Sequence, residues 1–90
     1  MQYSKITTSG TTVLKKSNGS LGRLIVSGPG TTWTIQIFDS DGVSGTPIFG
    51  GTAVTVPAAG TVIVFDLNFN QGLTVVTAGG AAGEITITWA

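Results

Sequence analysis

The stretch that decides the fold is Thr32-Trp33-Thr34-Ile35-Gln36-Ile37-Phe38, in which large apolar and polar side chains alternate. Successive side chains of a β-strand point to opposite faces of a sheet, so Trp33, Ile35 and Ile37 are predicted to share a buried face. Phe38 falls on the opposite face, with the threonines. No glycine-free window of useful length has apolar residues at the three-four spacing of a helix. The alternation therefore predicts a β protein.

Two later runs show the same period. Residues 61–69 place Ile63, Phe65, Leu67 and Phe69 on one face, and residues 84–89 place Ile85, Ile87 and Trp89 on one face. Runs rich in valine, isoleucine and threonine alternate along the chain with glycine-centred breaks about every 8–12 residues, a spacing typical of sandwiches and barrels. The prediction is a single all-β domain over residues 1–90: a compact antiparallel β-sandwich or jelly-roll-like barrel of seven or eight strands.

The breaks between these runs carry turn chemistry. Asn18-Gly19 suits the two-residue type I′ turn, which predicts a hairpin between residues 11–16 and 21–27. Gly50-Gly51 interrupts an apolar run and predicts a β-bulge. The remaining breaks predict turns or loops at residues 28–30, 39–45, 57–60, 70–72 and 78–83.

Composition narrows the function classes. Only 9% of the 90 residues are charged, the formal net charge is zero, and the chain has no cysteine and no histidine. No disulfide can form, a zinc site lacks its usual ligands, and the clustered basic surface that nucleic acid requires is missing. The first residues do not resemble a signal peptide, and no apolar run approaches the length that spans a membrane. A small uncharged domain of this kind is expected to associate with other subunits.

Two strands are apolar on both faces, Leu24-Ile25-Val26 and Val62-Ile63-Val64. A strand with one face in water should alternate between apolar and polar residues, so the second apolar face of these strands is expected to be covered by another part of the protein or by a partner. A loop or neighbouring strand of the same chain is one explanation, and a contact with another subunit is the other. Because the edges lack the charged residues that usually prevent pairing, we favour the subunit contact, with Ile25, Val62 and Val64 as interface residues.

The remaining chemistry is sparse. Asp39-Ser40-Asp41-Gly42 is similar to the start of a calcium loop, but a third ligand and the closing glutamate are missing, so an aspartate-rich turn is the preferred interpretation. Asp66 and Glu84 are not placed together by any pattern, and no nucleophile has a base. We expect no enzyme activity, no cofactor and no bound metal. Phe38, outward on its strand, is the aromatic residue expected to make an interface contact.

Two blocks of sequence, Tyr3 to Lys15 and Gly72 to Gly80, resemble a group of short proteins encoded by tailed bacteriophages. The apolar run Leu21 to Val26 and the threonine-rich final strand are similar to that group as well, so the resemblance extends over most of the chain. It implies a structural protein of the virion, with capsid decoration (cement) as the leading role. It supplies no catalytic residue.

The resemblance also implies partners and a location. The chain is expected in the virion, assembled in the host cytoplasm, in contact with the major capsid protein and with copies of itself. A trimer at a symmetry axis is the form that such proteins in general suggest. Neither nucleic acid nor a membrane is an expected partner. The alternative is a module of a head or tail fibre or baseplate that recognises host glycans.

Overall fold

The computed structural model describes residues 2–43 and 47–90, with the side chains of 51–53 outside this description. It contains eight strands: β1 (Gln2–Ile6), β2 (Gly10–Lys15), β3 (Gly19–Gly28), β4 (Thr31–Phe38), β5 (Pro47–Thr55), β6 (Val62–Phe69), β7 (Leu73–Ala81) and β8 (Glu84–Trp89). The described part contains no helix, and hence none long and apolar enough to cross a membrane. The prediction of an all-β fold is confirmed.

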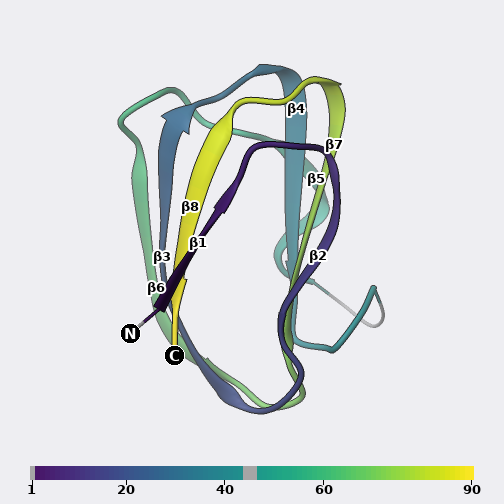
Figure 1. Cartoon of the computed structure of the whole chain (residues 1–90), viewed down its shortest axis with the longest axis vertical. Coiled ribbons are helices and arrows are strands. Elements are labelled where there is room, and N and C mark those ends of the chain that lie inside the picture. The colour runs from purple at the N-terminus through teal and green to yellow at the C-terminus, as the bar shows by residue number, and fades with distance from the viewer. Residues whose placement is uncertain (1, 44–46) are drawn as a thin grey trace.

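The strands form two four-stranded antiparallel sheets that face each other (Figure 1). One sheet has the order β1-β8-β3-β6 and the other the order β2-β7-β4-β5. The first strand therefore pairs with the last, the second with the seventh, the third with the sixth and the fourth with the fifth. This is the pairing that results when one long antiparallel ribbon is rolled up. This pairing is that of a jelly roll. Of the two related architectures predicted from the sequence, the structure therefore has the jelly-roll form.

The chain changes sheet at every connection except the one from β4 to β5. The predicted hairpin at Asn18-Gly19 is wrong for this reason: β2 pairs with β7, whereas β3 pairs with β6 and β8. Neither Asn18 nor Gly19 has the positive φ that a type I′ turn requires at both central positions. The turn residues are suited to a tight connection, but the connection crosses between sheets.

The core lies between the two sheets and is made by the inward residues of both. The predicted inward residues Trp33, Ile35 and Ile37 are fully buried, and so are Ile85 and Ile87. Phe69 is buried as well, and Ile63, Phe65, Leu67 and Trp89 pack against this cluster from its margin. The Phe65 ring meets Phe49 edge to face, with ring centroids 5.4 Å apart. The period-two prediction of the core is confirmed.

Glycines allow several tight backbone features. The predicted bulge is present, because Ile35 pairs with Val54 while Ile37 pairs with Phe49, and Gly50 has a φ of 74° there. The predicted turn at residues 57–60 is also present, with Gly60 donating to the Val26 carbonyl at 2.7 Å. Strand β7 differs from prediction: it continues to Ala81 through the expected glycine-alanine loop, since Gly79 pairs with Trp33 and Ala81 with Thr31. Of the predicted loop 39–45, residues 44 and 45 lie outside the described residues.

Candidate functional site: an apolar face of the β1-β8-β3-β6 sheet

Three of the four predicted interface residues lie on the outer side of the β1-β8-β3-β6 sheet. Val62 and Val64 of the edge strand β6 are 50% and 54% exposed. On the adjacent strand β3, Ile25 pairs with Val62 and Arg23 pairs with Val64. Alternation explains the placement: Leu24 and Val26 point inward and are buried, which turns Ile25 outward. The two-sided apolar runs found in the sequence are therefore neighbours on one surface.

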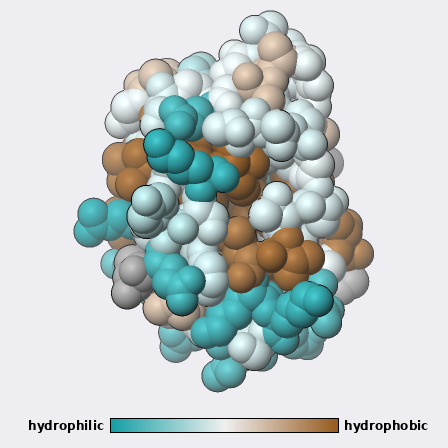
Figure 2. All heavy atoms as spheres, in the orientation of Figure 1, coloured by the Kyte–Doolittle hydropathy of each residue, from teal (hydrophilic) through white to brown (hydrophobic). Residues whose placement is uncertain are grey.

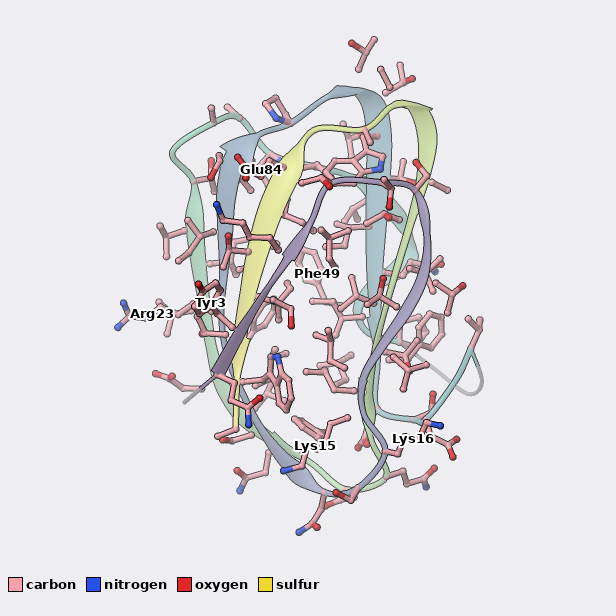
Figure 3. The ribbon with its side chains drawn as sticks, in the orientation of Figure 1. Tyr3, Lys15, Lys16, Arg23, Phe49 and Glu84 are labelled. Carbon is pink, nitrogen blue, oxygen red and sulfur yellow. The ribbon has the colours of Figure 1, made fainter. Side chains whose placement is uncertain are left out.

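This surface extends across the whole sheet. Thr86 of β8 pairs with both Ile25 and Lys5, and Tyr3 of β1 pairs with Thr88. Among the described residues, Tyr3 is the most exposed large apolar side chain, at 68%. Figure 3 shows Tyr3 and Arg23 on the same side of the molecule, away from the core. We call this surface the valine face; it comprises Tyr3, Ile25, Val62, Val64, Thr86 and Thr88, with Lys5, Arg23, Asp66 and Glu84 among them.

The charged groups of the valine face are few and differ in their partners. Lys5 and Glu84 form an exposed ion pair with 3.3 Å between Nζ and Oε1. Among the described residues, no ion pair or hydrogen bond engages the Arg23 guanidinium or the Asp66 carboxylate; Arg23 uses its backbone N–H to bond Thr88 Oγ1 at 2.7 Å. An exposed ion pair adds at most about 1 kcal/mol to stability. The valine face is thus apolar and threonine-lined, with one unpaired charge of each sign.

Figure 2 shows the distribution of hydropathy over the surface in this view, with strongly hydrophilic residues in several separate groups. Pale residues of intermediate hydropathy cover much of it, apolar groups appear at the side of the β1-β8-β3-β6 sheet, and hydrophilic groups gather at the lower end. Lys15 and Lys16 lie at that lower end (Figure 3). Four of the eight charged residues, Lys5, Arg23, Asp66 and Glu84, nevertheless lie on the valine face, which therefore combines apolar, threonine and charged side chains.

Phe38, the fourth predicted interface residue, is not on the surface. Its side chain is 4% exposed, so the prediction that it is available for contact is wrong. Phe38 does occupy an outward position, next to Thr74 on β7, but Thr74 is fully buried too and donates its hydroxyl to the Ser40 carbonyl at 2.9 Å. The chain after Phe38 therefore folds back over the outer side of the β2-β7-β4-β5 sheet. No sequence pattern signals this local cover.

Asp39 anchors the same returning segment. Its carboxylate oxygens accept the backbone N–H groups of Asn70, at 2.9 and 3.0 Å, and of Gln71, at 2.8 Å. These oxygens stabilise the turn between β6 and β7, which agrees with the interpretation of an aspartate-rich turn. In the described part of the chain, no group of three or more acidic side chains lies close enough to hold a metal ion, and no pocket is found.

The hydrogen bond from the Gln71 backbone is the main cause that lowers the pKa of Asp39 below its ordinary value, against an opposing effect of burial. Because the folded pKa lies below the unfolded one, Asp39 contributes its full stabilisation above about pH 4 and loses it as the pH falls through the folded pKa. We expect Asp39→Ala to lower the free energy of unfolding by about 1 kcal/mol near neutral pH. Urea unfolding at pH 7 and at pH 3 measures this effect.

Asp41→Ala is the matched control for Asp39, because Asp41 is an exposed carboxylate nearby and no hydrogen bond among the described residues ties it to the β6–β7 turn. The difference between D39A and the unmodified chain should shrink at pH 3, because the unfolded carboxyl protonates below about pH 4 and offsets part of the advantage of the folded carboxylate. Equal losses for D39A and D41A at pH 7 would contradict the anchoring role.

The edges of both sheets are protected by their geometry. Strand β2 has a register shift between Val13 and Lys15, β5 has the bulge at Gly50, and β6 has a shift opposite Gly22 where Asp66 takes a φ of 47°. Strand β1 has only five residues. Bulges and short edge strands prevent edge-to-edge pairing as charged residues do. The protection that the sequence appeared to lack is therefore provided by the backbone, and the valine face remains as the surface for contacts.

No protein-family model matches this sequence, and the search of curated proteins returns no match. The function of this chain is therefore inferred from its fold, the valine face and the resemblance described above.

Proposed function

We propose that this chain is a non-enzymatic structural protein of a tailed-bacteriophage virion, with decoration of the capsid as its role. The observation that carries the proposal is the valine face. Its exposed Tyr3, Val62 and Val64 lie on the same side of one sheet of a jelly roll, Tyr3 on one edge strand and the two valines on the other. Jelly rolls occur in viral capsid domains and also in lectins, so the fold agrees with the proposal as an analogy.

The physical basis is burial of this face in an assembly. Each square ångström of apolar surface removed from water contributes about 25 cal/mol, so a face of this size gives a modest interaction for each copy. Repetition of the interaction around a shell multiplies its effect, and any partner that binds only the folded chain also stabilises it by mass action. A structural protein of this type needs no single deep site.

Purified particles provide the direct test. Quantitative mass spectrometry of density-purified virions should find this chain in hundreds of copies, comparable with the major capsid protein. Val64→Lys should reduce the copy number at least tenfold, because a buried, unpaired ammonium group opposes docking. Val43→Lys is the matched control, since Val43 is 58% exposed but lies in the connection after β4, away from the valine face.

The alternative role, host glycan recognition by a fibre or baseplate module, would give a different result. A handful of copies per particle, together with binding of the isolated chain to a glycan array, would favour it. Tyr3 replaces Phe38 as the aromatic residue to test, because an exposed ring on a sheet can stack on a sugar. Absence of the chain from purified particles would reject both roles.

A further inference from the structure

The valine face has a charge pattern that can complement itself. Arg23 on β3 and Asp66 on β6 are both exposed and flank the apolar residues Val62 and Val64. Asp66 lies opposite Gly22, directly next to Arg23 in the register, and the 4 Å limit of an ion pair is not met between them. One cation and one anion, side by side and unpaired within the described chain, therefore lie on β3 and the edge strand β6, next to the exposed valines.

We propose that the valine face binds the valine face of a second copy of this chain, related by a two-fold axis. In such an isologous contact, residue i of one chain meets residue j of the other and the reverse contact forms as well. Arg23 of each chain then pairs with Asp66 of its partner, the two ion pairs lie next to each other at the two-fold axis, and Val62 and Val64 of both chains pack beside them. This inference rests on the proposed function only in that both use the same surface.

Face-to-face packing of two antiparallel sheets already occurs inside this fold, between its own two sheets. Two antiparallel sheets stack face to face about 10 Å apart, with strands crossing at about 30°, when their facing sides are apolar. The valine face provides such a side with threonine methyl groups, Ile25, Val62 and Val64. The shifts in β2, β5 and β6 disfavour edge-to-edge pairing, which favours face-to-face packing over edge pairing for two copies.

The size of the face sets the expected affinity. Four strands about 4.8 Å apart and some 25 Å long present roughly 500 Å², so two copies bury at most about 1,000 Å². This area lies at the low end for specific interfaces, where complexes are weak. We therefore expect a dimer that forms at micromolar or higher concentrations, which sedimentation velocity over a concentration series can detect.

Charge reversal distinguishes a self-complementary contact from other kinds of association. R23E gives each chain two carboxylates at the contact, and D66K gives each chain two cations, so each variant alone should lose at least tenfold in dimer affinity. A one-to-one mixture of the two variants restores both ion pairs, and a heterodimer should form with close to the unmodified affinity. Sedimentation of R23E, D66K and their mixture therefore tests the two-fold geometry directly.

Matched controls keep the result specific. K16E and D41K change the net charge equally at exposed positions away from the valine face, and they should leave the dimer unchanged. Since Asp66 has a φ of 47°, where lysine is less favourable, D66N supplies a second variant with lower strain, and thermal unfolding confirms that each variant is folded.

The outcomes separate this inference from the proposed function. An unmodified chain that stays monomeric at millimolar concentration, a trimer, or a mixture that does not restore association would each overturn the two-fold contact. None of these results bears on whether the chain is present in hundreds of copies in virions, which the particle measurement decides independently.

Discussion

Replacing Trp33 by alanine is expected to remove a large part of the folding stability of the domain. Trp33 is fully buried at the centre of β4, and its indole N–H donates to Ser9 Oγ at 3.1 Å. Truncation of a buried tryptophan costs about 3–5 kcal/mol, because apolar surface is exposed and a cavity remains. A domain of this length has a total stability of roughly 5–13 kcal/mol, so this loss removes a large part of it. Far-UV circular dichroism during urea unfolding measures the change.

Two variants divide the contribution of Trp33 into its parts. Ser9→Ala removes only the acceptor of the indole N–H and should cost about 1 kcal/mol. Trp33→Phe keeps much of the apolar volume and should lie between S9A and W33A. If W33A unfolds at nearly the same urea concentration as the unmodified chain, the position of Trp33 at the centre of the core is wrong.

Substitution of Gly79 by alanine should have a comparable effect for a backbone reason. Gly79 has a φ of 125°, a conformation that is essentially reserved for glycine, and a Cβ atom there would overlap the carbonyl oxygen of Thr32. Since Gly79 pairs with Trp33 across β4 and β7, relief of the overlap must separate the two central strands of the sheet. We expect a loss of about 3 kcal/mol or more, measured by thermal and urea unfolding.

A series of glycines separates conformational strain from crowding. Gly60 has a φ of 88° but open space around its Cβ position, so Gly60→Ala should cost about 1–2 kcal/mol from strain alone. Gly42 has neither a positive φ nor a close neighbour, so Gly42→Ala should be nearly neutral. Equal effects for G79A and G60A would mean that the contact between β4 and β7 is looser than described.

The residues of the valine face could be predicted from the sequence only in part. The runs Leu24-Ile25-Val26 and Val62-Ile63-Val64 predict strands with apolar residues on both sides, and Val62 and Val64 are indeed exposed. Their position side by side could not be predicted, because it depends on the pairing of β3 with β6, which are separated by more than thirty residues. Arg23 and Asp66 are neighbours only because of the same pairing of β3 with β6.

Phe38 marks the limit of the same reasoning. Its outward position on β4 follows from alternation and is correct, but its burial follows from the returning segment at Asp39 and Ser40. That segment is held by Asn70 and Gln71 of the β6–β7 turn and by Thr74 of β7, which follow it in the sequence by more than thirty residues. Exposure therefore depends on contacts that no local pattern contains.

The amino-acid sequence alone was enough to predict most of the strands and the buried side of those strands, as Trp33, Ile35, Ile37, Ile85 and Ile87 show, whereas β1 and the end of β7 at residues 78–81 were not predicted as strand. These properties are local, because consecutive side chains of an extended chain alternate in direction. Only the tertiary structure decided which strands pair, why Asn18-Gly19 joins two sheets, and which apolar residues remain on the surface. A backbone N–H can bond to any strand that reaches it, so the choice of partner is made by the packing of the whole chain.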